Sequence, residues 1–155
     1  MSSLKDRLHD DLTTAMKARD ELVTATLRMA LTAVTTEEVA GKSARVLTDE
    51  EVVGVLSREA KRRREAAEAY DAADRPELAA RERAEEAVIA GYLPAQLDPA
   101  ALSGLVEAAV ADARGAGLEG GRAMGAVMKA LQPQVAGRAD GAAVAASVKQ
   151  ALGLG

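Results

Sequence analysis

The sequence predicts an all-α protein, and three observations lead to that fold class. Apolar residues recur every three or four positions along most of the chain, which is the spacing of one helical face. Alanine, the best helix former, supplies much of the 48% hydrophobic fraction, whereas Phe, Trp and Cys are absent. We find no stretch of convincing strand alternation and no internal repeat. Leu, Val and Met must therefore supply most of the burial term, at roughly 1.5–3 kcal/mol per fully buried side chain.

An N-terminal four-helix domain is predicted in residues 1–94. Ser3 and Asp20 can cap the first two helices, because their side chains accept bonds from first-turn amides. Thr48, which three acidic residues follow, predicts the start of a long third helix of about 25 residues, or ~37 Å. Pro76 fits the first position of a fourth helix, so the third and fourth helices are expected to form a helical hairpin.

The buried faces of this hairpin follow from the apolar spacing. The middle of the third helix is charged nearly all round, which predicts that it projects past the core or bridges to a partner. In the fourth helix we expect Leu78, Val88 and Ile89 to be buried. The predicted buried side of the third helix comprises Val52, Val53, Leu56, Ala60, Ala67 and Tyr70.

A small C-terminal three-helix bundle is predicted in residues 98–155, after a short linker. Asp98 can cap its first helix, and the glycine-rich segment 115–121 forms a flexible loop. The second helix is expected to be closed by Pro133, and Asp140 to cap the last one. Met124 and Met128, at helical spacing, are expected in the core of this bundle.

Charge and composition exclude several classes of protein and site. The net charge is −4; residues 1–97 carry 15 basic and 19 acidic groups, whereas residues 98–155 carry 5 of each. Nucleic-acid binding would therefore need a local patch. No apolar run approaches the ~20 residues of a membrane span and no signal peptide is visible, so we expect a cytoplasmic protein without membrane contact. Without cysteine and with only His9, neither a metal site nor a cofactor is expected.

The densest basic run lies on the predicted third helix and comprises Arg58, Lys61, Arg62, Arg63 and Arg64. Several cations on one helical face can bind phosphates, because each neutralised phosphate releases counterions. Acidic residues at positions 59, 65 and 68 can instead pair with these cations at helical spacing. Three interpretations are open: a solvated, salt-bridged face, a phosphate or RNA patch, and a protein-partner surface.

An acidic group on the predicted fourth helix complements this run. Glu82, Glu85 and Glu86 lie three and four residues apart on one helical face. A metal or acid–base site would need carboxylates in this arrangement, but no histidine lies near them. Pairing with the basic helix beside them is the favoured interpretation. The hairpin then predicts that residues 61–65 and 82–89 lie side by side.

Three further features are interpreted as structural. Tyr70 is expected beneath the helix break and Tyr92 against the junction of the two domains, because two aromatic residues are too few for a base-stacking platform. His9 is expected on the surface. The segment from Gly115 to Gly125 lacks a preceding strand and a Gly-Lys-Ser/Thr ending, which argues against a phosphate-binding loop.

Four motifs in order and at characteristic spacing resemble the YqeY-like family, within the GatB/YqeY group. They are Lys-Arg-Arg-Arg through Arg-Pro-Glu-Leu-Ala at 61–79, Tyr-Leu-Pro-Ala-Gln-Leu at 92–97, Gly-Ala-Val-Met-Lys at 125–129 and Gly-Arg-Ala-Asp-Gly at 137–141. The sequence departs from the family pattern at Ala66, where serine is common, and at Asp74, where glycine is common.

The resemblance implies more about binding than about catalysis. The C-terminal part is similar to the tail domain of the B subunit of the glutamine-dependent, tRNA-charging amidotransferase, which grips the outer corner of tRNA and carries no catalytic residues. The amidotransferase's active-site domain has no counterpart in this chain. By this resemblance, the positions expected to face RNA are Lys129, Arg138, Lys149 and Arg122.

Three functional hypotheses follow. The first is a non-catalytic accessory factor that binds tRNA or another structured RNA and assists tRNA-linked amidation or translation. The second is a carbon–nitrogen ligase that uses glutamine as amide donor; it rests on the family label, because no nucleophile, general base or nucleotide-binding loop is visible. The third is a protein-interaction module that docks a partner on the long charged helix.

Overall fold

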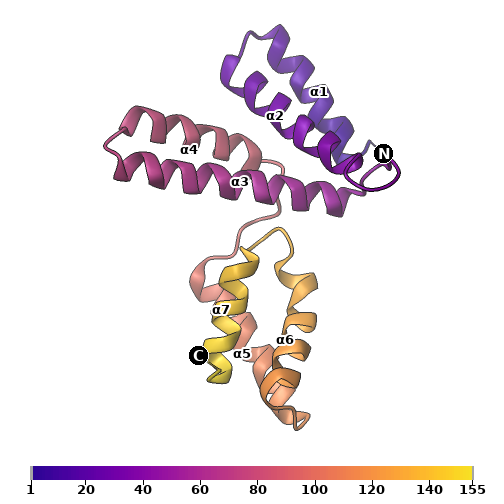
Figure 1. Cartoon of the computed structure of the whole chain (residues 1–155), viewed down its shortest axis with the longest axis vertical. Coiled ribbons are helices and arrows are strands. Elements are labelled where there is room, and N and C mark those ends of the chain that lie inside the picture. Colours follow the sequence, from indigo (N-terminus) through magenta and orange to yellow (C-terminus); the bar gives the residue numbers. More distant parts are fainter. Residues whose placement is uncertain (1, 155) are drawn as a thin grey trace. The chain divides into compact units, whose positions relative to one another are not determined.

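The structure, a computed structural model, describes residues 2–154, which form seven α-helices and no β-strand (Figure 1). The predicted all-α class is confirmed. The chain divides between Leu93 and Pro94 into two compact units, each with its own hydrophobic core. No helix of residues 2–154 combines the length and the apolar character that crossing a membrane requires.

The first unit contains two helical hairpins, which are distinct in Figure 1. Its helices are α1 (Leu4–Lys17), α2 (Glu21–Glu38), α3 (Asp49–Ala72) and α4 (Pro76–Ala90). Helix α2 contacts both members of the second hairpin, so the two hairpins share one core. The fully buried side chains at its centre are Leu8, Leu27, Ala30, Val34, Val52 and Leu56.

The predicted helix starts of this unit are confirmed. Ser3 and Thr48 each form a capping box, in which the cap side chain and the third helical residue bond each other's backbone amides. The Asp20 carboxylate accepts a bond of 3.1 Å from the Val23 amide. Pro76 stands in the first turn of α4, where its missing N–H has no intrahelical partner to lose.

Helix α3 ends in a turn that normally favours glycine. The Arg75 amide donates to the Tyr70 carbonyl at 2.8 Å, and the Asp74 amide donates to the Asp71 carbonyl at 3.1 Å. This bonding pattern requires the left-handed conformation, which Asp74 adopts with φ of 58°. An aspartate therefore occupies a backbone position that glycine fills at lower steric cost.

Two expectations about burial in the hairpin were wrong. Leu78 is 42% exposed, whereas the adjacent Ala79 is fully buried, because neighbouring residues point about 100° apart around a helix. Val53 is only half-buried, and Val55 takes the core position. Helix α4 packs along the middle of α3, while the core that the two hairpins share extends along α3 only as far as Ala60.

The second unit is built from α5 (Pro99–Gly115), α6 (Gly120–Val135) and α7 (Gly141–Leu152). Val127, Leu131 and other buried side chains form its core, and Met124 and Met128 pack against them, as predicted. Pro133 was expected to close α6, but the helix continues to Val135. A proline removes only its own amide donor and clashes one turn back, which a helix tolerates more easily near its end.

The turn between α6 and α7 is bonded to the segment that precedes α5. The Leu97 amide donates to the Arg138 carbonyl at 2.9 Å, and Gln96 Nε2 donates to the Gly137 carbonyl at 2.8 Å. Asp140 occupies the N-cap position of α7, as predicted, but its side chain makes no capping bond to the helix start. The two bonds from Leu97 and Gln96 therefore join this turn to the segment before α5.

Candidate functional site

The predicted juxtaposition of the basic run and the acidic group is confirmed. Arg64 Nε lies 3.1 Å from Glu86 Oε1, and Arg63 Nε lies 3.3 Å from Glu85 Oε2. Each pair joins α3 to α4, so residues 61–65 lie beside residues 82–89. Glu85 also accepts a bond of 3.1 Å from Arg81 one turn earlier. Two members of the acidic group, Glu85 and Glu86, are therefore engaged by arginines.

Arg63 is a buried charge at the centre of this network. Its side chain is 4% exposed, and Nη1 donates to both the carbonyl and the carboxylate of Glu59 at 3.1 Å. Nη2 lies 3.6 Å from the Met29 sulfur, whereas Nε meets Glu85 at ion-pair distance without hydrogen-bond geometry. Two carboxylates thus offset the cost of burying the guanidinium. A phosphate at the protein surface therefore cannot reach the Arg63 guanidinium.

The burial of Arg63 escaped the sequence analysis, although the sequence contains a signal for it. Ala60 and Ala67 lie three residues before and four residues after Arg63, and both are buried. Residues at this spacing share one helical face, so Arg63 belongs to the buried stripe of α3. Arg63 was expected at the surface because it is charged, although its spacing from Ala60 and Ala67 indicates a buried position.

The other cations of the run are paired but remain at the surface. Lys61 lies 4.0 Å from Glu65, and Arg62 lies 3.8 Å from Glu59 with 79% of its side chain exposed. Exposed pairs of this kind contribute at most about 1 kcal/mol, so they restrain the side chains only weakly. The run matches the salt-bridged alternative more closely than a free phosphate patch.

The C-terminal candidates have a different environment. Arg122 and Lys129 are exposed on α6, and their separation of seven residues places them on one face, about 10 Å apart along the axis. Lys149 is exposed on α7. Within residues 2–154, no carboxylate lies within 4.0 Å of these three cations. Their charges are therefore available to an anion.

The guanidinium of Arg138, unlike these three cations, is engaged in hydrogen bonds within the protein. Its Nε donates to the Ala95 carbonyl at 2.9 Å, and its Nη1 donates to the Gln134 carbonyl at 3.2 Å. The guanidinium therefore ties the segment before α5 to the end of α6. Replacing this arginine would disturb the local backbone as well as the surface charge.

Tyr92, for which a place at the junction of the two domains was expected, packs against the core of the first unit. Its hydroxyl donates to Asp11 Oδ2 at 2.5 Å, and the Arg7 guanidinium lies 4.8 Å from the centre of its ring. Burial and the bond to Asp11 raise the pKa of Tyr92 well above its usual range. Tyr92 thus connects the segment that follows α4 to α1. His9 is exposed on α1, as predicted.

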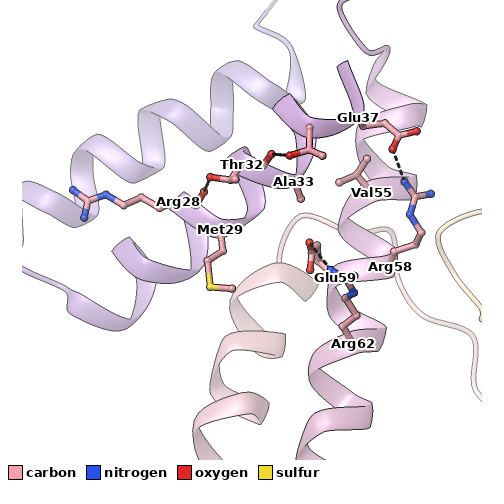
Figure 2. A pocket seen from close by; sticks show the side chains of 10 residues that line it. Arg28, Met29, Thr32, Ala33, Glu37, Val55, Arg58, Glu59 and Arg62 are labelled. Carbon is pink, nitrogen blue, oxygen red and sulfur yellow. Dashed lines mark hydrogen bonds and ion pairs between the residues drawn. The ribbon is translucent and has the colours of Figure 1, made fainter. Parts of the chain in front are cut away.

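An open groove of about 570 Å³ lies between α2 and α3 (Figure 2). Its lining mixes three arginines and two glutamates with threonine and apolar side chains, and Figure 2 shows both helices contributing. Arg58 and Glu37 approach to 3.7 Å across it. The residues from α2 are Arg28, Met29, Thr32, Ala33, Thr36 and Glu37, and those from α3 are Val55, Arg58, Glu59 and Arg62.

The groove has the chemistry of a binding surface. Its lining contains neither histidine nor a nucleophile beside a base, so it offers no acid–base or covalent constellation. The hydroxyls of Thr32 and Thr36 donate to carbonyls one turn earlier, both at 2.9 Å. The α2 side of this groove was not predicted from the sequence. The signal for it was the row of exposed threonines on that face of the helix.

A comparison with known protein families decides the assignment. Residues 5–152 match the family described as Yqey-like protein. The chain belongs to the YqeY-like protein family. No curated protein matches this YqeY-like chain. The resemblance drawn from the four sequence motifs is thus confirmed over nearly the whole chain.

The departure at residue 74 now has a structural account. The resemblance led us to expect glycine at this position, and the left-handed backbone of Asp74 is the conformation that glycine adopts most readily. Aspartate also enters this region more easily than most residues, because its short polar side chain can bond locally. The turn before Pro76 is therefore kept at a modest cost in stability.

Proposed function

We propose that this YqeY-like protein is a non-catalytic accessory factor that binds tRNA or another structured RNA through its second unit. The observation that supports this proposal is that Arg122, Lys129 and Lys149 are exposed and have no carboxylate within 4.0 Å in residues 2–154. The basic run of α3, by contrast, is engaged by acidic residues. Cations without carboxylate partners are the ones that phosphates can recruit at least cost.

We also infer that the two units act as separate domains, a four-helix domain (residues 1–94) and a three-helix domain (98–155). The second domain carries the RNA contacts, and the similarity of its motifs to the tail of the amidotransferase B subunit favours tRNA as the ligand. The proposal places the protein in the cytoplasm and gives it a role in tRNA-linked amidation or translation.

The contacts are to phosphate and shape rather than to bases. Both tyrosines, Tyr70 and Tyr92, lie in the first unit, so the second unit offers no aromatic side chain for stacking. Three phosphate contacts predict a salt slope of about −2 for single strands and about −2.7 for duplex regions. The affinity should then fall about 20- to 40-fold between 50 and 200 mM salt.

The proposal is tested with full-length protein and unfractionated tRNA, by fluorescence anisotropy at both salt concentrations. Replacing Arg122, Lys129 and Lys149 together by alanine should remove most of the salt-dependent binding. The matched control replaces three exposed cations of the first unit, Lys17, Lys42 and Arg75, and should bind tRNA as the parent protein does.

If the two triple variants lose the same amount of tRNA affinity, the binding depends on net charge alone and the proposed site is wrong. If the parent protein does not bind tRNA at 50 mM salt, the proposal is wrong. Arg138→Ala is not used, because its guanidinium bonds two carbonyls of the second unit. If the purified protein hydrolyses glutamine or transfers its amide group, the protein is a carbon–nitrogen ligase and the non-catalytic proposal is wrong.

A further inference from the structure

The outward face of α2 between Leu22 and Glu37 carries one basic and one acidic residue, Arg28 and Glu37. Its other exposed residues are Met29 and three threonines. Met29 is 54% exposed and lines the groove between α2 and α3. Interface cores are enriched in Met and Arg and poor in Lys and Asp, and this face has the first two residue types and neither of the last two.

The residues that α2 contributes to the groove have a regular order. They form three adjacent pairs, Arg28–Met29, Thr32–Ala33 and Thr36–Glu37, which are spaced four residues apart. Residues four apart form the ridges along which helices pack, and the lining holds two of them, Arg28–Thr32–Thr36 and Met29–Ala33–Glu37. The basic residue begins the first ridge, the acidic residue ends the second, and Thr32 and Ala33 lie at the centre.

The order of these residues is complementary to the same order read in the opposite direction, as in an antiparallel second copy of α2. If a second α2 is laid antiparallel with the two-fold axis between Thr32 and Ala33, Arg28 faces the partner subunit's Glu37. In the same register Met29 faces the partner subunit's Thr36, and Thr32 faces the partner subunit's Ala33. The symmetry repeats each contact, so both ends receive an opposite-charge pair and the small central residues permit close approach.

We propose that the groove between α2 and α3 binds α2 of a second copy of this chain, which makes the protein a symmetric, antiparallel dimer. The mixed charge of the groove favours this occupant over a polyanion, because RNA would meet Glu37 and Glu59 as well as the arginines. Glu37, which already lies 3.7 Å from Arg58, is placed between that arginine and the partner subunit's Arg28. This inference is independent of the RNA proposal.

The test is the mass of the full-length protein in solution, measured by sedimentation equilibrium without RNA. We expect a concentration-dependent equilibrium between monomer and dimer. Arg28→Glu and Glu37→Arg each place like charges face to face at both ends, and each should weaken dimerisation at least about tenfold. An equimolar mixture of the two variants pairs opposite charges again and should recover the parent affinity to within about threefold.

A second measurement uses the absence of cysteine from the chain. Thr32→Cys places a thiol beside the two-fold axis and should oxidise to a covalent dimer, whereas Thr13→Cys, exposed on α1, should remain a monomer under the same conditions. A monomeric parent protein at every concentration overturns the proposal, whatever else the groove binds. Failure of the mixture to restore the dimer, or equal oxidation of the two cysteine variants, does the same.

Discussion

Replacing Arg63 by methionine tests whether its buried ion network holds α3 against α4. The variant leaves Glu59 and Glu85 facing each other without the cation between them. Removing one partner of a buried pair costs about 3–5 kcal/mol. Each glutamate keeps one exposed arginine, Arg62 at 3.8 Å and Arg81 at 3.1 Å. These partners lower the expected loss in the free energy of unfolding to about 2–3 kcal/mol.

The assay follows the first unit by itself. Both tyrosines of the chain, Tyr70 and Tyr92, lie in this unit, and the chain has no tryptophan. Intrinsic tyrosine fluorescence during urea unfolding therefore reports on the hairpins alone. With an m value of about 2 kcal/mol/M, the midpoint should fall by about 1–1.5 M.

The matched control is Arg62→Met on the same helix. The Arg62 side chain is 79% exposed, so its loss should change the free energy of unfolding by less than about 0.5 kcal/mol. Adding Glu85→Gln to Arg63→Met should recover about 1 kcal/mol, because it neutralises a carboxylate that has lost its buried partner. If Arg63→Met lowers the midpoint no more than Arg62→Met does, the network does not stabilise the hairpin.

The remaining predictions concern three other positions. Bonds from Lys5 Nζ and the Leu47 amide lower the pKa of Glu38 in the folded protein. The ionised Glu38 therefore contributes fully to the free energy of unfolding above its unfolded pKa of about 4.3, and this contribution is lost as the pH falls through the lower folded value. Glu38→Gln should consequently make the urea midpoint fall less steeply below pH ~5. Asp74→Gly should raise the free energy of unfolding of the first unit by about 0.5–1 kcal/mol in the fluorescence assay, whereas Asp74→Val should lower it. Pro133→Ala should stabilise α6 by about 1 kcal/mol, measured as roughly fivefold slower amide exchange of that helix, and unchanged exchange would contradict the proposed cost of the proline.

Helix starts could be predicted from the sequence because capping is local. Ser3, Asp20, Thr48 and Asp98 each bond an amide three residues ahead, within one turn of the same chain. No distant contact is needed to form such a bond. The end of α6 was not predicted as well, because a proline near a helix terminus permits either a stop or two further residues.

The pairing of the two long hairpin helices was also predictable. A short turn at Asp74 forces α3 and α4 to run antiparallel, and the basic and acidic groups lie at similar distances from that turn. Arg64 therefore meets Glu86, as the charge pattern indicated. For the second unit the motif resemblance supplied the candidate residues, but the sequence did not show that Arg138 bonds carbonyls while Lys129 remains exposed without a carboxylate partner.

The sequence by itself determined the all-α class, the positions where most helices begin and the register of one hairpin, because these features depend on residues within a turn or across a single tight loop. Only the tertiary structure decided that Arg63 is buried, that Leu78 faces outward and that α2 and α3 enclose a groove. These outcomes depend on how helices distant in sequence pack, since a side chain becomes buried only where a second helix covers it.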